Sequence, residues 1–98
     1  MRWVAIFDDR EGAEAVRERY AEAHLAYLAK NRDRIRLAGG LRPAPDERCR
    51  GGLWVLEAVA REEAIVLIEN DPFFVHGLRK SYRLLIWGKA PCYDRVVL

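Results

Sequence analysis

The sequence predicts an α+β domain in which the element order β-α-β-β-α-β builds an antiparallel sheet with its helices on one face. Strand-like and helix-like segments follow one another along the chain in that order, and no internal repeat or low-complexity segment interrupts them. The 98 residues, of which 51% are hydrophobic and 33% charged, suit a single domain over residues 1–98 and exclude a disordered chain.

The first half of the chain predicts a strand, a helix and a second strand. Residues 2–7 are β-rich, and Asp8 and Asp9 then supply oxygens that can cap a helix. Residues 12–30 lack proline, and Asn31 is a plausible helix end because it tolerates the left-handed conformation. Residues 35–41 predict the second strand, in which glycines 39 and 40 indicate a bulge or a close backbone approach. The helix has one stripe at helical spacing: Ala13, Val16, Tyr20, Ala23, Tyr27 and Lys30.

The second half predicts two strands separated by a helix. A polar loop over residues 42–52 leads into a strand at 53–59 and a helix at 61–69. Pro72 disfavours helical geometry at Asp71 and ends that helix, after which residues 73–80 are expected to add one or two helical turns. The last strand is expected at 82–87, followed by a tail that contains Pro91.

The strands are apolar on both faces. A sheet with one solvated face alternates apolar and polar residues, and two helices can cover only one face. We therefore expect a homodimer in which a second copy, related by two-fold symmetry, covers the open face. The alternation is absent within residues 3–7, 53–56 and 84–87.

Composition narrows the class of protein. Seventeen Lys and Arg against 15 Asp and Glu give a net charge of +2, too balanced for a dedicated nucleic-acid binder. The small basic cluster of Arg79, Lys80 and Arg83 is expected to be a solvated face. No apolar run approaches the ~20 residues of a membrane span, and the early acidic residues exclude a signal-peptide core. We expect a cytoplasmic protein without nucleic-acid or membrane partners.

The cysteines and short motifs offer no metal or organic cofactor site. Cys49 and Cys92 are isolated from each other, so they form neither a disulfide framework nor a zinc site. Cys49 lies between two arginines, which would favour a reactive thiolate, or it is an incidental loop cysteine. The chain lacks GxGxxG, P-loop, HExxH and paired CxxC motifs. We expect no metal and no organic cofactor.

His24 and Asp71 are the candidate catalytic residues. On a helical wheel His24 lies about 40° from Tyr20 and about 60° from Tyr27, on the arc that faces the sheet. An imidazole there either exchanges protons near neutral pH or is a core histidine satisfied by a carbonyl. Asp71 either caps the next helical turn or orients an imidazole, as the acidic member of a His–Asp pair does.

Three short motifs resemble those of the YciI-like (YCII-related) family. They are HLAYL at residues 24–28, RLAGGLRP at residues 36–43 and NDPF at residues 70–73. The resemblance covers nearly the whole chain. It implies a ferredoxin-like fold of the dimeric α/β barrel type and an active site made from a helix histidine and the aspartate of the DP motif. Those roles carry over to His24 and Asp71.

The chain departs from the family pattern at two places. Residues 51–53 read Gly-Gly-Leu where relatives often have Ser or Thr, so only backbone groups are offered there. Arg42 either brings a cation to the pocket rim, where it would bind a substrate carboxylate, or is a solvated loop residue. Tyr27 and Phe73 either stack on a substrate or belong to the core, as does Tyr20. His76 either faces the same cavity or covers the end of the short helix.

These observations support a cofactor-independent lyase or isomerase for a small unsaturated acid or lactone. In this hypothesis His24 moves the proton, Asp71 holds the imidazole tautomer and Arg42 fixes a carboxylate. The first alternative is a non-catalytic small-molecule-binding or accessory domain that uses the same cavity, because one fold can serve both roles. The second is a cofactor-free monooxygenase, which has no sequence feature of its own here.

Overall fold

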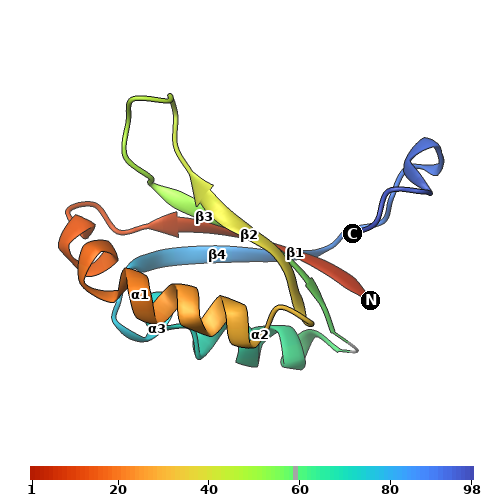
Figure 1. Cartoon of the computed structure of the whole chain (residues 1–98), viewed down its shortest axis with the longest axis horizontal. Helices are drawn as coiled ribbons and strands as arrows, with labels where there is room; N and C mark the ends of the chain where they lie inside the picture. Colours follow the sequence, from red (N-terminus) through yellow and green to blue (C-terminus); the bar gives the residue numbers. More distant parts are fainter. Residues whose placement is uncertain (59) are drawn as a thin grey trace.

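The computed structural model describes residues 1–58 and 60–98, and these form a four-stranded antiparallel sheet with helices on one side (Figure 1). The strand order is β2-β3-β1-β4. This is the predicted α+β, ferredoxin-like architecture of the dimeric α/β barrel class. The elements in chain order are β1 (Arg2–Asp9), α1 (Glu14–Lys30), β2 (Ile35–Leu41), β3 (Gly51–Glu57), α2 (Arg61–Glu69), α3 (Pro72–Val75), β4 (Arg79–Ile86) and the 3-10 turn η1 (Pro91–Tyr93).

Strand pairing lengthens the sheet beyond the predicted bounds at one end. β2 and α2 have the predicted limits, whereas β1 continues to Asp9, and β3 and β4 begin earlier, at Gly51 and Arg79. The reason is tertiary, because Asp8 pairs with Gly51 and Asp9 pairs with Arg79. Of the helical turns predicted within 73–80, the structure has only the short helix α3, because the last two residues of that range belong to β4. Val59, the predicted end of the third strand, lies outside the described residues.

The predicted start of the first helix is wrong. Asp8 and Asp9 belong to β1, and Ala13 occupies the N-cap position of α1 without a side-chain hydrogen bond. Asn31 does end the helix, but with φ at −109° rather than in the left-handed region; its Nδ2 donates to the Tyr27 carbonyl at 2.8 Å. The predicted buried stripe of α1 is wrong at Ala23 and Lys30, which are exposed. The buried face of the helix includes His24 instead.

The core lies between the helices and one face of the sheet. Ala38, Trp54, Ala5 and Leu84 face one another across the four strands and form its central row. Trp54 is 1% exposed, and its ring meets that of Phe7 edge-on, with the ring centroids 5.2 Å apart. The helices close the core from below in Figure 1, and α2 contributes buried side chains to it.

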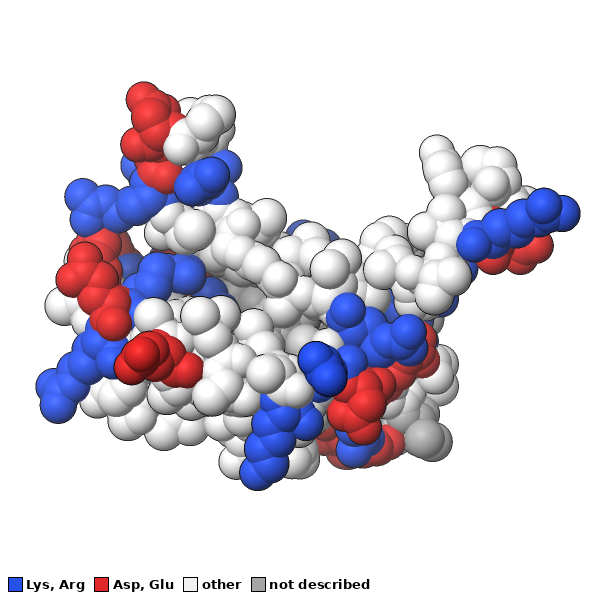
Figure 2. Space-filling view, in the orientation of Figure 1, with Lys and Arg blue, Asp and Glu red and all other residues white. Residues whose placement is uncertain are grey.

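The other face of the sheet is apolar and uncovered in the single chain. Leu37, Val55, Val4 and Leu85 form a second row across the strands, and its outer members are exposed by 53% at Leu37 and 43% at Leu85. The β2–β3 hairpin and the C-terminal tail rise on this side, away from the helices (Figure 1). Between them Figure 2 shows an almost uncharged surface. Among the described residues, no helix is both long and apolar enough to cross a membrane.

The packing of the core predicts a large cost for truncating Leu56, which is fully buried on β3. We expect Leu56→Ala to lower the free energy of unfolding by about 2–5 kcal/mol, because it removes buried methyl groups and leaves a cavity. Val66→Ala is the matched control, since Val66 is 59% exposed on α2; it should change stability by less than about 0.5 kcal/mol. Urea denaturation followed by circular dichroism measures both. Equal effects would contradict this description of the core.

Candidate active site

His24 and Asp71, which are 47 residues apart in the sequence, are in direct contact. Nδ1 of His24 lies 2.7 Å from Oδ1 of Asp71. The histidine projects from the middle of α1, and the aspartate lies at the corner between α2 and α3. Both are buried, with 9% of His24 and 1% of Asp71 exposed. The contact therefore brings together a proton-accepting ring and a carboxylate away from bulk water.

The backbone at Asp71 explains why its carboxylate is available. Pro72 is the first residue of α3, and a proline disfavours helical geometry at the residue before it, so Asp71 is extended, with φ −65° and ψ 132°. This conformation is that of an N-cap residue. The carboxylate, however, makes no capping hydrogen bond and instead reaches His24. The cap interpretation thus describes the backbone of Asp71 but not its side chain.

The surroundings of His24 fix its ring orientation and its tautomer. Phe73 stacks on the imidazole, with ring centroids 3.9 Å apart and 12° between the planes. An ionised Asp71 only accepts hydrogen bonds, so the neutral imidazole carries its proton on Nδ1 and its lone pair on Nε2. Nε2 is then the atom left to exchange a proton with a ligand.

A hollow of about 310 Å³ lies beside His24, and we call it the His24 hollow. Its size is at the lower end of the range for small-molecule sites. The lining is mainly apolar, and its ionisable side chains are those of His24, Arg17 and Arg79. The lining residues are Arg17, Ala21, His24, Leu25 and Leu28 from α1, Ala38, Gly39 and Gly40 from β2, and Trp54, Phe73 and Arg79.

Asp9 binds both arginines of the His24 hollow. Its Oδ1 accepts from Nη1 of Arg79 at 2.7 Å, and its Oδ2 accepts from Nη2 of Arg17 at 2.6 Å. The side chain of Arg79 is 3% exposed, and its guanidinium carbon lies 4.4 Å from the centre of the Phe7 ring. Burial lowers the pKa of Arg79, while the hydrogen bond that Arg79 donates to Asp9 acts in the opposite direction. Because arginine starts far above neutrality, this guanidinium is charged at pH 7.

The predicted solvated face of Arg79, Lys80 and Arg83 is therefore wrong for Arg79. Lys80 and Arg83 are exposed, as expected, but Arg79 points into the core side of the sheet and is paired with Asp9. Alternation alone would place Arg79 on the same face as Arg83; the register shift between Asp8 and Asp9 in the β1–β4 pairing turns Arg79 to the core side, opposite Asp9. One member of the cluster belongs to the site and the other two do not.

The remaining predicted site residues divide into one that lines the His24 hollow and three that do not. Phe73 lines it and stacks on His24. The hydroxyl of Tyr27 donates to the Leu67 carbonyl at 2.7 Å, and burial, with the Asp71 charge, raises the pKa of Tyr27. Arg42 is exposed in the loop after β2. His76 is exposed and stacks on Tyr20, with ring centroids 3.6 Å apart.

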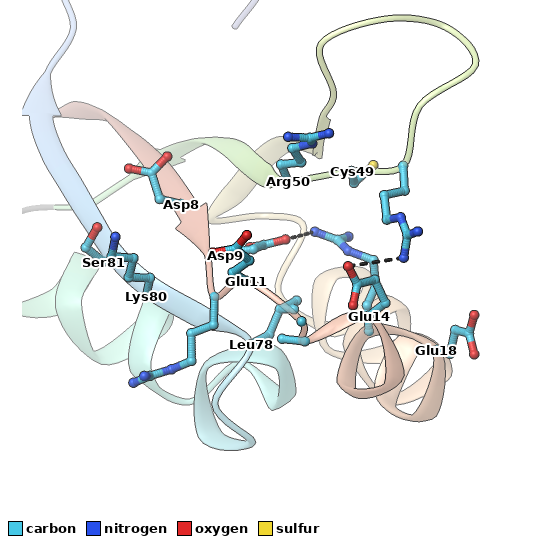
Figure 3. Close-up of a pocket in the computed structure, with 15 residues that line it drawn as sticks. Asp8, Asp9, Glu11, Glu14, Glu18, Cys49, Arg50, Leu78, Lys80 and Ser81 are labelled. Carbon is cyan, nitrogen blue, oxygen red and sulfur yellow. Dashed lines mark hydrogen bonds and ion pairs between the residues drawn. The ribbon is translucent and has the colours of Figure 1, made fainter.

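A larger charged hollow of about 780 Å³ lies where β1 leads into α1 (Figure 3). Within its lining, Arg48 pairs with Glu14 at 3.1 Å and Arg17 pairs with Asp9 at 2.6 Å. Arg17 lines both hollows, whereas its partner Asp9 lines only the charged one. Cys49, a free thiol, lies at the edge of the charged hollow. Within the described residues, no set of three His, Cys, Asp or Glu side chains is placed to bind a metal ion.

Comparison with known proteins establishes the family. The profile of the YCII-related domain matches residues 1–88. The chain belongs to the YCII-related domain family. No curated protein matches the chain significantly.

Solved structures of known proteins share the fold of this YCII-related chain. One is 5-chloro-2-hydroxyhydroquinone dehydrochlorinase from Burkholderia phenoliruptrix AC1100 in complex with 2,5-dihydroxybenzoquinone; it is 29% identical over 92% of this chain and 96% of that chain, with a TM-score of 0.84. The cofactor-independent oxygenase SnoaB from Streptomyces nogalater is 12% identical over 92% of this chain and 94% of that chain, with a TM-score of 0.52. The second likeness shows the fold alone.

Sequence reasoning missed Asp9, Arg17 and the role of Arg79. A charged residue on a helix or strand is usually solvated, so none of the three stands out by composition or period. The signal that could have found Asp9 and Arg79 is the pairing of β1 with β4, which brings the two residues opposite each other; no such signal points to Arg17, which lies on α1. That pairing follows from the strand order.

The shared carboxylate predicts a strong dependence of stability on Asp9. We expect Asp9→Asn to lower the free energy of unfolding by about 3–5 kcal/mol, because it leaves the buried Arg79 cation without its counter-charge. Asp8→Asn makes the same chemical change at an exposed position of the same strand and should stay within about 0.5 kcal/mol. Urea titrations of the two variants provide the comparison. A mild loss in Asp9→Asn would mean that Arg79 has another counter-charge.

Proposed function

We propose that this YCII-related protein is a cofactor-independent lyase or isomerase that uses His24 and Asp71 to move a proton on a small unsaturated ring substrate, such as an acidic hydroxylated ring or a lactone. The observation that carries the proposal is the 2.7 Å contact between Nδ1 of His24 and Oδ1 of Asp71 at the wall of an apolar hollow. The 29% identity to a dehydrochlorinase, an enzyme of the elimination class, favours the same kind of chemistry.

The proposed step begins with Asp71 accepting the Nδ1 proton in a hydrogen bond, so that Nε2 of His24 is the base. Nε2 removes a proton from the substrate, and the electron pair of the broken bond forms a new double bond. In an elimination the leaving group departs with its own pair, and the proton follows it into water. In an isomerisation His24 returns the proton to another carbon. Neither route needs an oxidant or a reductant.

The surroundings suit general acid–base catalysis of this kind. The stacked Phe73 and the hydrogen bond to Asp71 hold the ring in one orientation, which reduces the ordering needed at the moment of reaction. A positioned imidazole contributes about 10²–10⁴-fold to a proton transfer. That range is sufficient for substrates whose C–H or O–H bond is already activated by a neighbouring carbonyl.

The decisive test removes the imidazole. We expect His24→Gln to lower turnover by about 10²–10⁴-fold with its melting temperature nearly retained, because the base is lost while the Gln amide keeps an N–H that can donate to Asp71. Asp71→Asn should also lower turnover, since the favoured tautomer is no longer fixed. Chloride release from 5-chloro-2-hydroxyhydroquinone and ultraviolet changes of small unsaturated lactones provide the assays.

The control is His76→Gln, because His76 stacks on Tyr20 away from the His24 hollow. Its turnover should equal that of the unaltered protein. Loss of stability in parallel with activity in His24→Gln would favour a core histidine. Ligand binding without turnover of any substrate would favour the non-catalytic binding domain, and oxygen uptake with a quinol would favour the monooxygenase.

We also propose that a second copy of the chain covers the open sheet face, giving a homodimer. The row of Leu37, Val55, Val4 and Leu85 crosses all four strands of that face, and Trp87 and Leu41 add exposed apolar area. Covering an exposed side chain of the size of Leu or Trp gains up to about 1.5–3 kcal/mol, whereas Val55 is already buried in the single chain and adds nothing. A two-fold axis places the same apolar rows against each other, which suits a self-complementary interface.

Leu85→Glu tests the homodimer. Sedimentation velocity at micromolar concentration should show a dimer for the unaltered protein and a monomer for Leu85→Glu, because a buried unpaired charge opposes association. Val66→Glu places the same charge on the exposed side of α2, where Val66 is 59% exposed, and should remain dimeric. A monomeric unaltered protein would refute the proposal.

A further inference from the structure

The buried guanidinium of Arg79 has an unused hydrogen-bond donor. Its Nε is fully buried and has no hydrogen-bond partner among the described residues. A buried donor without a partner is unfavourable, and more so when it is charged. Arg79 also lines the His24 hollow, where a ligand would lie. The wall of the hollow therefore contains a cation whose hydrogen-bond donors are not all satisfied within the described residues.

The backbone leaves space for this guanidinium. A Cβ added to Gly52 would lie 3.2 Å from Nη2 and 3.3 Å from Nη1 of Arg79, closer than a side chain normally tolerates. Gly52 belongs to the Gly-Gly-Leu stretch that the sequence analysis noted for its missing hydroxyl, and the absence of a side chain at Gly52 leaves room for a cation. Phe7 lies against the guanidinium at 4.4 Å and restricts its movement further.

A second cation lies on the same wall. The guanidinium carbon of Arg17 is 5.2 Å from the centre of the Phe73 ring, the same ring that stacks on His24. Both arginines share the single carboxylate of Asp9. Asp71, the other carboxylate near them, is bonded to His24. The arginines therefore have donor capacity that Asp9 does not use, since each guanidinium has five N–H groups.

We propose that the His24 hollow takes its ligand as a planar, ring-sized oxyanion (a carboxylate, phenolate or enolate oxygen), held by Arg17 and Arg79 while the carbon skeleton lies beside Nε2 of His24. This deepens the proposed function and rests on it for the catalytic consequence. The anion-binding role that the sequence suggested for Arg42 passes to these two residues, because Arg42 does not line the hollow.

The consequence for the reaction is stabilisation of negative charge. When Nε2 of His24 takes a proton from carbon, the C–H pair forms a C=C bond and the carbonyl pair moves onto oxygen. That oxygen would lie against the two guanidinium groups. Fixed cations at the place where charge develops are the usual means of stabilising such an intermediate, because they need little rearrangement.

The test measures binding, so that it does not depend on turnover. The probes are benzoate and benzamide, which share a planar ring and differ in the charge of one group. We expect benzoate to bind the unaltered protein at least about tenfold more tightly in ¹⁵N-resolved NMR titrations, with shifts at Ala38, Gly39 and Gly40. Equal affinities, or shifts elsewhere only, would overturn the proposal.

The matched variants are Arg17→Gln and Arg19→Gln, which remove the same charge two residues apart on α1. Arg19 is exposed and does not line the His24 hollow. Arg17→Gln should weaken benzoate binding by about 10–100-fold and leave benzamide binding unchanged, whereas Arg19→Gln should change neither. Arg17→Lys keeps the charge and should retain most of the affinity. A loss that is equal in Arg17→Gln and Arg19→Gln would overturn the proposal.

Failure of this inference and failure of the proposed function are distinguishable. His24→Gln should still bind benzoate while losing turnover. If the protein prefers benzoate to benzamide but converts none of the tested substrates, the oxyanion site is supported and the proposed enzymatic function is not. If the protein converts a substrate but binds benzoate and benzamide equally, the proposed enzymatic function is supported and the oxyanion site is not.

Discussion

The hydrogen bond between His24 and Asp71 is the constraint on which the geometry of the site depends. Asp71 is 1% exposed, and a buried carboxylate without a partner would cost several kcal/mol. The bond therefore ties α1 to the corner between α2 and α3. Phe73 follows Asp71 by two residues and is brought onto the imidazole by the same corner. One interaction thus fixes the tautomer, the ring orientation and one wall of the His24 hollow.

The sheet supplies the second half of the site. Because β1 pairs with Gly51 on one side and with Arg79 on the other, it continues to Asp9 instead of stopping where its apolar residues end. This extension places the carboxylate of Asp9 next to two arginines, one from α1 and one from β4. The charged part of the site thus lies where β1 ends and β4 begins, beside α1, while the apolar rows form the core and the open face.

Local patterns predicted the elements better than the charged contacts. The limits of β2 and α2 were predicted from the Gly, Asn and Pro residues near their ends and from the periodicity of apolar residues. The predicted limits of both elements agree with the structure. His24 and Asp71 were each open to a second interpretation from the residues alone; the family resemblance paired them, and only tertiary structure shows the contact. Asp9 was misassigned as a helix cap because capping is a local rule, whereas its partner Arg79 is 70 residues away.

The charges around the His24 hollow explain why an imidazole suits this position. Arg17 and Arg79 face Asp9 and Asp71, so the fixed charges balance when His24 is neutral. Imidazole is the side chain that gains and loses a proton near neutral pH without leaving its place. In the proposed reaction His24 takes a proton from a bound ligand, so that the imidazole gains one positive charge and the ligand gains one negative charge. The transfer leaves the total unchanged, so the arginines need only stabilise charge that moves within the hollow.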